Sequence, residues 1–360
     1  MNTPMMSDMA LPLTTEAVTA AWLEVALRFR HPGVRLESLR IEDVILGTST
    51  KIRVRPRYVP GHGAGLPETF IVKGGFEAHS PSMKEMYANE IRAYRDVLPF
   101  IAMNAPACYY AGSDPGSHQS IVVMEDLLPA GTSFLHAQRP QRPAQVARRL
   151  EAMARYHAQT WNSAEFAPGQ RWDFVGGRHE GWSVVYQDRY LVPEVWQHWM
   201  NSPRGAAVST RLHDGEWMRC ALRALGRYHQ QFPVCLIHGD THLGNLYEEA
   251  DGTPGFFDMQ VARAPWFTEV TYHLVAALDV NERPSAEQAL LRHYLDALKR
   301  EGAPAPSFAE AWEAYRREIA YGLFIFLINE TRFQTEAINT AYTARFGAAA
   351  LQHGTIELLG

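Results

Sequence analysis

Four polar residues able to do chemistry directly follow an apolar run in the stretch VCLIHGDTHLGN, residues 234–245. They are His238, Asp240, His242 and Asn245. On an extended segment alternate side chains fall on one side, so the first three form a plausible set of metal ligands. The same stretch also suits an acid/base loop for phosphoryl transfer, or an ordinary polar turn. Partners elsewhere in the chain must decide between these three interpretations.

The metal interpretation lacks the further ligands that it needs. The string GDTH resembles that of two-metal phosphoesterases, which also require an upstream Asp-x-His and a downstream Asn-His-Glu/Asp. This chain has neither, because Asn245 is followed by Leu246 and Tyr247. A metallohydrolase is therefore not favoured.

Phosphoryl transfer needs a different set, and every member is present in a workable order. A carboxylate orients the attacking hydroxyl, an amide and a second carboxylate hold Mg²⁺, and a lysine steadied by an acid grips the nucleotide. Lys73 stands in the apolar stretch FIVKGG, and Glu90 lies on the helix predicted next. Asp240 and Asn245 share the loop after VCLI, and Asp258 follows in GFFDMQ. These residues favour a phosphotransferase.

The loop sequence HGDTHLGN resembles the HGDxHxxN signature of the aminoglycoside phosphotransferase and choline-kinase-like enzymes, which are relatives of protein kinases. The spacing from Asp240 to Asn245 to Asp258 fits that group. The stretches VVMEDL (122–127) and DMQ resemble the hinge and the "DFQ" of its ecdysteroid-kinase-like branch. The resemblance spans roughly residues 40–280. It implies an α+β, protein-kinase-like bilobal fold with a small β-rich N-lobe and a larger, mostly helical C-lobe.

The resemblance also implies a role for each matching residue. Asp240 is the catalytic base or the carboxylate that orients the acceptor, and Asn245 and Asp258 bind Mg²⁺. Lys73 contacts the α- and β-phosphates of ATP, and Glu90 pairs with Lys73. The remaining nucleotide contacts are the main chain around Glu125 and Leu127 for the adenine, and the loop residues Thr48, Ser49 and Thr50 for the phosphates.

Two segments depart from the pattern of this group. The expected phosphate-covering loop LGTSTK (46–51) contains one glycine, Gly47, so hydroxyls and backbone N–H groups must bind phosphate there. Glu269 in PWFTEV stands where related enzymes usually have an aspartate that tethers the catalytic loop. A glutamate can form this tether only with adjusted geometry.

Hydrophobic periodicity predicts the elements that must position these residues. A helix over 14–30 precedes strands over 36–46, 50–59 and 68–75; a helix over 82–97 precedes two more strands, in APACYYAGSD and QSIVVMEDL. A helix over 143–161 and further helices follow a Pro/Gly-rich connector, and the apolar run 319–328 is a core helix. We expect a nucleotide-binding lobe over residues 1–128 and a catalytic, acceptor-binding lobe over 129–360.

Composition narrows the class of protein. A net charge of −5 gives no electrostatic reason to bind nucleic acid or an anionic membrane. Three cysteines without CxxC spacing indicate a reducing compartment, and MNTPMMSDMALPL shows no signal peptide. The sequence therefore predicts a cytoplasmic protein, with no information on its oligomeric state.

The phosphate acceptor is predicted only as a small molecule with a hydroxyl group. The middle of the chain is rich in aromatic residues, which either pack a core or line an acceptor pocket: Trp161, Trp172, Trp182, Tyr186, Tyr190, Trp196, Trp199 and Trp217. Such a pocket suits an apolar alcohol, or an ammonium boxed by aromatic rings. The predicted protein is thus an ATP- and Mg²⁺-dependent small-molecule kinase; the alternative is a catalytically silent, nucleotide-binding pseudokinase scaffold.

Overall fold

The structure, a computed structural model, describes residues 9–360. Residues 1–8 lie outside the described residues, and the prediction that the N-terminus is not a signal peptide falls largely on them. The chain forms two compact units. The first unit is Met1–Phe100 with Ala105–Thr132, and the second is Ile101–Asn104 with Ser133–Gly360.

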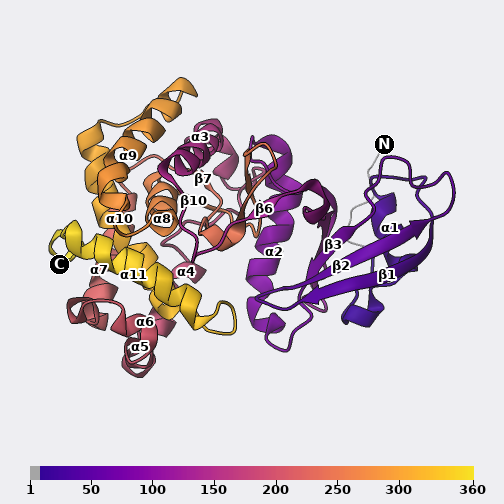
Figure 1. Ribbon diagram of the computed structural model, residues 1–360, viewed down its shortest axis with the longest axis horizontal. Coiled ribbons are helices and arrows are strands. Elements are labelled where there is room, and N and C mark those ends of the chain that lie inside the picture. The colour runs from indigo at the N-terminus through magenta and orange to yellow at the C-terminus, as the bar shows by residue number, and fades with distance from the viewer. Residues whose placement is uncertain (1–8) are drawn as a thin grey trace. The chain divides into compact units, whose positions relative to one another are not determined.

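The first unit is a five-stranded antiparallel sheet with a helix on each face (Figure 1). Its elements are α1 (Ala20–Arg28), β1 (Leu36–Ile45), β2 (Thr50–Tyr58), β3 (Phe70–Gly74), α2 (Lys84–Arg92), β4 (Cys108–Ser113) and β5 (Ser120–Glu125). The strand order is β1-β2-β3-β5-β4. The predicted order of helix, three strands, helix and two strands is therefore confirmed.

The two helices of this unit differ from prediction at their ends. The helix predicted from residue 14 begins at Ala20, because the hydroxyl of Thr19 caps it by accepting from Trp22 N at 3.2 Å. The helix predicted over 82–97 continues past α2 as a π-helical segment, Ala93–Val97. Hydrophobic periodicity in the sequence indicates which face of a helix is buried. It does not show where the helix begins, or whether a turn is α-helical or π-helical.

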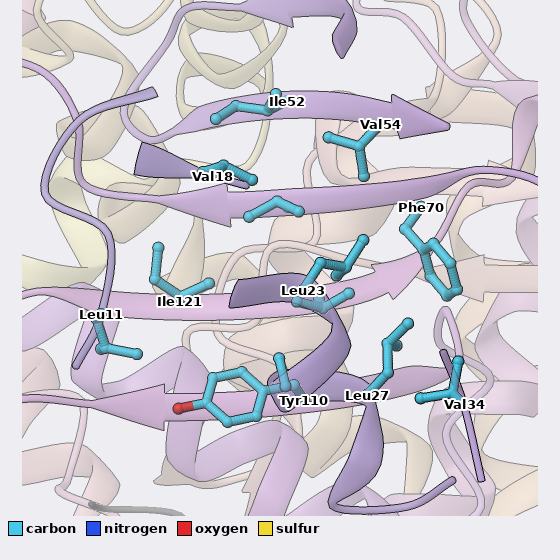
Figure 2. Packing of buried hydrophobic residues seen from close by; sticks show 13 residues of the cluster. Leu11, Val18, Leu23, Leu27, Val34, Ile52, Val54, Phe70, Tyr110 and Ile121 are labelled. Carbon is cyan, nitrogen blue, oxygen red and sulfur yellow. The ribbon is translucent and has the colours of Figure 1, made fainter. Parts of the chain in front are cut away.

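One face of the sheet packs on α1, and along the inner strands the side chains alternate between this face and the opposite one. Figure 2 shows Leu23 and Leu27 of α1 in one hydrophobic cluster with Ile52 and Phe70 of the sheet. All four side chains are fully buried. Because successive side chains in a strand point to opposite faces, Lys73 follows buried Val72 onto the face away from α1. The helix α2 packs on β4 and β5 and carries Glu90.

The second unit is mostly helical, with two small sheets among the helices (Figure 1). Its helices are α3 (Pro143–Gln159), α4 (Trp182–Tyr190), α5 (Pro193–Met200), α6 (Pro203–Ala206), α7 (Gly215–His229), α8 (Phe267–Ala277), α9 (Arg283–Arg300), α10 (Phe308–Ile328), α11 (Glu336–Gln352) and α12 (Thr355–Leu359). Its strands are β6 (Ser133–Phe134), β7 (Cys235–Ile237), β8 (Leu246–Glu248), β9 (Pro254–Phe256) and β10 (Ala262–Ala264).

Two helices form the centre of this unit. Every residue of α8 is buried, and α10 contacts α7, α8, α9 and α11. Residues 319–328 lie within α10 and are nearly all buried, which confirms the predicted core helix. Within the described residues, no helix is long and apolar enough to span a membrane.

The small sheets hold the loops that carry the predicted catalytic residues. β7 pairs antiparallel with β10, and β8 lies between β6 and β9. The stretch 238–245 connects β7 to β8, and Asp258 follows β9. The predicted fold class, a small β-rich lobe followed by a larger helical lobe, is confirmed.

Candidate active site

The catalytic loop turns sharply after β7 because Gly239 occupies a conformation reserved for glycine. Its φ is +91°, and a Cβ at this position would lie 1.9 Å from the carbonyl oxygen of Gln260. His238 fixes the same turn with both ring nitrogens: Nε2 donates to Phe257 O at 2.9 Å, and Nδ1 accepts from Asp240 N at 3.2 Å. Burial lowers the pKa of His238, which keeps the ring neutral. This histidine therefore shapes the loop and is not available to a metal.

Asp240 is held through both carboxylate oxygens. The hydroxyl of Tyr272 donates to Oδ1 at 2.9 Å, and the amide nitrogen of Asn245 donates to Oδ2 at 2.9 Å. The side chain is still 32% exposed, so a small molecule can reach it. Burial by itself would raise the pKa of Asp240, but His242 and Tyr272 lower it to about 2. Asp240 is therefore a fixed, ionised carboxylate at neutral pH.

Asn245 and Asp258 are brought together by the pairing of β8 with β9. Leu246 lies opposite Phe256, and Phe257 N donates to Asn245 O at 3.1 Å. The next residue, Asp258, has a φ of +59°, a left-handed conformation that aspartate tolerates better than most residues. Since the amide nitrogen of Asn245 donates to Asp240, its amide oxygen is the atom that can act as a metal ligand. An amide oxygen beside a carboxylate fits Mg²⁺, a hard cation that prefers oxygen ligands.

A buried arginine from α3 holds these two strands in place. Arg149 donates to Gly255 O at 2.7 Å and to Tyr247 O at 2.8 Å, one carbonyl from each strand. Its guanidinium carbon lies 5.1 Å from the centroid of the Phe256 ring. Burial lowers the pKa of Arg149 to about 10, which leaves it charged at neutral pH. The hairpin that carries Asn245 and Asp258 is thus braced by a fixed cation.

Glu269 forms the tether that the sequence predicts. From the first turn of α8, its Oε1 accepts from Gly239 N at 3.2 Å. Its Oε2 accepts from the hydroxyl of Tyr156 at 2.6 Å and lies 2.9 Å from His157 Nε2. Burial by itself would raise the pKa of Glu269, but His157, His238 and Tyr156 together hold it below its ordinary value. The longer glutamate therefore supports the catalytic loop and is itself anchored on α3.

The sequence analysis did not identify three residues that contact the catalytic loop: Tyr272, Arg178 and Gln334. Tyr272 donates to Asp240, as described above. Arg178 donates to Gly239 O at 2.5 Å, and the side-chain amide of Gln334 lies 2.9 Å from His242 Nε2. Since Nδ1 of His242 accepts from Gly244 N, Nε2 carries the proton and the amide oxygen of Gln334 must face it. Tyr272 follows Glu269 by three residues on one helix, a spacing that places both side chains on the same face. No comparable signal marks Arg178 or Gln334.

In the first unit, Lys73 and Glu90 form a buried ion pair. Lys73 Nζ donates to Glu90 Oε1 at 2.6 Å, and both side chains are 5% exposed. Lys51 lies opposite Lys73 in the pairing of β2 with β3, so the two side chains share a face of the sheet. Burial and the charge of Lys51 lower the pKa of Lys73 to about 8, against the opposing effect of Glu90. A second cation beside Lys73 is a feature that the sequence analysis did not single out.

The three hydroxyl residues of the predicted phosphate loop, Thr48, Ser49 and Thr50, differ in burial and in hydrogen bonding. The hydroxyl of Thr50 donates to Glu77 Oε1 at 3.1 Å, and both Thr50 and Ser49 are buried. Thr48 accepts through its carbonyl oxygen from the hydroxyl of Tyr87. The Thr50 hydroxyl is therefore already engaged, and phosphate contacts from Thr50 and Ser49 stay predictions. Thr48 is the more exposed of the three residues, and its phosphate role stays a prediction.

At the end of β5, some of the main-chain N–H groups already donate hydrogen bonds within the first unit. The N–H of Glu125 donates to Ala107 O at 2.8 Å, and Asp126 beside it pairs with Arg53 at 2.8 Å. Within the described residues, the N–H of Leu127 makes no main-chain hydrogen bond. An adenine at this edge would thus find its donor at Leu127. The adenine-binding role stays a prediction.

The aromatic residues of the second unit divide between core and cavity. Trp172 and Trp196 are each 4% exposed and belong to the core. Tyr190 and Trp199 instead line a cavity of about 400 Å³, together with Arg189, Glu194, Val195, His198 and Glu330. The guanidinium carbon of Arg204 lies 4.5 Å from the centroid of the Trp199 ring. The core interpretation therefore holds for Trp172 and Trp196, whereas an acceptor pocket at Tyr190 and Trp199 stays a prediction.

Solved structures show which class of fold these elements define. A Plasmodium vivax ethanolamine kinase aligns with a TM-score of 0.52 at 11% identity, over 86% of this chain and 81% of that chain. The GDP complex of wild-type aminoglycoside 2′-phosphotransferase-IIIa aligns with a TM-score of 0.55 at 10% identity, over 92% of this chain and 99% of that chain. The fold is that of the kinase-like phosphotransferases.

The sequence itself assigns the chain to a family. Residues 73–312 match the phosphotransferase enzyme family (APH), and the protein belongs to that family. No curated protein matches the sequence. The prediction of a small-molecule kinase with a protein-kinase-like fold is confirmed, whereas membership of the ecdysteroid-kinase-like branch stays a prediction.

Proposed function

We propose that the protein transfers the γ-phosphoryl group of ATP to a hydroxyl group of a small molecule, with Mg²⁺ as the required cation. The observation that carries this proposal is the carboxylate of Asp240, which Tyr272 and Asn245 hold through both oxygens while one face stays accessible. Phosphoryl transfer depends on positioning and on charge stabilisation more than on a strong base. A rigid, exposed carboxylate is suited to that task.

Asp240 orients the acceptor and receives its proton. The acceptor hydroxyl donates a hydrogen bond to the carboxylate, which aligns its oxygen for in-line attack on the γ-phosphorus. As the new O–P bond forms and the bond to the leaving ADP breaks, the hydroxyl proton passes to Asp240 and then to solvent. With a pKa of about 2, Asp240 is a weak base, so the proton moves late in the reaction.

Asn245 and Asp258 hold the metal ion in this proposal. Their amide and carboxylate oxygens fit Mg²⁺, which when bound neutralises charge on the β- and γ-phosphate oxygens. Arg149 braces the two strands that present these residues, so the donors are placed before the ion arrives. Glu269 does the same for the loop that carries Asp240.

Lys73 grips the α- and β-phosphates, and Glu90 keeps its ammonium group in position. The buried ion pair supports these roles, and Lys51 adds positive charge on the same face of the sheet. The main chain at Glu125 and Leu127 receives the adenine, and Thr48 contributes to the phosphate-covering loop. In this scheme residues 1–128 bind the nucleotide, and residues 129–360 carry the catalytic loop and the acceptor. The predicted cytoplasmic location suits the use of ATP.

The acceptor occupies the cavity between α4, α5 and the loop before α11. That loop carries both Glu330, which lines the cavity, and Gln334, which contacts His242 beside Asp240. About 400 Å³ is within the usual range for small-molecule sites. Arg204 already stacks on the ring of Trp199, so this tryptophan is poorly suited to box an ammonium group. We therefore favour an uncharged, partly apolar alcohol.

A transfer assay with a panel of acceptors tests the function. The purified protein is incubated with ATP or GTP and Mg²⁺ and with aminoglycosides, choline, ethanolamine, sugars or sterols. We expect Mg²⁺-dependent transfer to an uncharged hydroxyl compound. Nucleotide binding without transfer to any class would instead identify a pseudokinase scaffold and overturn the proposal.

Two variants test the assignment of the cavity. Val195→Asp places a charge in the cavity lining, so the KM for the acceptor should rise at least tenfold while nucleotide affinity is unchanged. Val185→Asp is the matched control, because Val185 is 68% exposed on the adjacent helix α4 and does not line the cavity. Equal acceptor KM values in both variants would place the acceptor elsewhere.

A further inference from the structure

Two histidines and a glutamate meet in the second unit, apart from the residues assigned to catalysis. His179 lies in the loop before α4, His229 is the last residue of α7, and Glu318 is in the middle of α10. His229 Nε2 lies 2.7 Å from Glu318 Oε2, and the two imidazole rings are 4.6 Å apart at 80°. One ligand atom from each residue lies within 4.8 Å of the other two.

Several polar atoms of this cluster are buried without a partner. Neither Nδ1 nor Nε2 of His179 makes a hydrogen bond within the described residues, and the same holds for Oε1 of Glu318. By contrast, His238 and His157 have a partner for each ring nitrogen. Buried polar groups are nearly always satisfied, so these orphaned atoms require an explanation. A cation between them would satisfy the cluster.

The backbone of α7 comes close to His179 at the point where both nitrogens of its ring are buried. Gly226, inside α7, leaves space for this ring, since a Cβ there would lie 3.3 Å from His179 Cβ. A glycine inside a helix lowers its stability, which is consistent with a requirement for close approach at this point.

We propose that His179, His229 and Glu318 bind one divalent transition-metal cation of the zinc type. Two imidazole nitrogens and one carboxylate oxygen are a typical donor set for Zn²⁺, whose fourth position is then filled by water. Ligand atoms around tetrahedral zinc lie about 3.3 Å apart, so small side-chain rotations complete the site. A ring nitrogen binds a metal through its lone pair, so Nε2 of His229 must carry no proton when it is a ligand. Any proton on that atom then moves to Nδ1 or to solvent.

The site also has a connection to the catalytic loop. Arg178, next to His179 in the chain, donates to Gly239 O, and Gly239 precedes Asp240. A cation that fixes His179 against α7 and α10 therefore also fixes the backbone that presents Arg178. The charge of Arg178 opposes a second cation nearby, and the carboxylate of Glu318 offsets that repulsion.

Metal titration of the metal-free protein tests the proposal. Zn²⁺ is added in the presence of excess Mg²⁺, which occupies oxygen-donor sites, and binding is followed by calorimetry and by metal analysis after desalting. We expect one zinc ion per chain, with affinity at least tenfold lower in His179→Ala and Glu318→Gln. Co²⁺ in place of zinc should give the strong visible absorption of a tetrahedral site. The result does not depend on the proposed kinase activity.

The matched control is His293→Ala. His293 pairs with Glu151 at 2.9 Å on the surface, and among residues 9–360 this histidine–carboxylate pair has no third metal-binding side chain. Its loss should leave zinc affinity unchanged. If His179→Ala does not fold, as judged by circular dichroism, His179→Gln and Glu318→Gln decide the question. The absence of saturable zinc binding, or equal affinity in the wild type and these variants, would overturn the proposal.

Discussion

The hydroxyl of Tyr272 lies 2.9 Å from Oδ1 of Asp240 and donates a hydrogen bond to it. Tyr272 is fully engaged in the core of the second unit, where its ring stacks on Phe326 at a centroid distance of 5.5 Å. A core helix therefore holds one oxygen of the Asp240 carboxylate, while Asn245 of the catalytic loop holds the other. Tyr272 acts as a positioning residue in this account.

Replacement of Tyr272 by phenylalanine should lower kcat about tenfold, which corresponds to about 1.4 kcal/mol and to the loss of one hydrogen bond to a charged group. The ring still packs, so the fold and the affinity for nucleotide should not change. Steady-state kinetics with both substrates varied measures this split between kcat and KM. Tyr228→Phe, on the partly exposed side of α7, is the control. An unchanged kcat would show that Asp240 does not need this hydrogen bond.

Glu269→Gln should lower the free energy of unfolding by about 1–3 kcal/mol at neutral pH, because a buried hydrogen-bonding network loses its negative charge and one of its two acceptor oxygens. The pKa of Glu269 is lowered in the folded protein, so its stabilising effect is present above the ordinary value of 4.5 and is lost as the pH falls. The difference between wild type and variant should therefore shrink on acidification. Denaturant titrations at neutral pH and near pH 4 measure it.

The control for this comparison is Glu301→Gln, a partly exposed carboxylate whose ion pair with Arg155 spans 3.6 Å. Surface pairs of this kind contribute little, so no measurable change is expected. If Glu269→Gln were equally destabilising at both pH values, the charge of Glu269 would not be the source of its effect.

Nucleotide affinity should fall as the pH rises through about 8. The pKa of Lys73 is lowered to about 8 by burial and by Lys51, and only the charged ammonium group binds phosphate well. Above that pH, the dissociation constant should rise by up to about tenfold per pH unit. Calorimetric titrations with ATP between about pH 7 and 9.5 measure this dependence.

The matched variant is Lys73→Arg, since a guanidinium group stays charged over this range. It should bind more weakly than the wild type at neutral pH but lose the alkaline dependence. A wild-type affinity that is constant across the range would contradict the assignment of Lys73 to the phosphates.

The sequence revealed those parts of the site that are encoded locally. The spacing between Asp240, Asn245 and Asp258 reflects one loop and one hairpin, and the alternation around Lys73 reflects one strand. Contacts such as Gln334 with His242, or Arg178 with Gly239, join segments that only tertiary packing brings together. No periodicity or motif encodes such pairs. The engagement of the Thr50 hydroxyl by Glu77 was missed for the same reason.

The central claim is that Asp240 positions the acceptor for phosphoryl transfer, and Asp240→Asn tests it most directly. Transfer of label from γ-labelled ATP to the acceptor is measured under single-turnover conditions, beside Asp296→Asn, which changes an exposed carboxylate of α9. The account predicts that Asp240→Asn lowers the rate by about 10²–10⁴-fold with nucleotide affinity nearly intact, whereas Asp296→Asn matches the wild type. Full transfer activity in Asp240→Asn would contradict it.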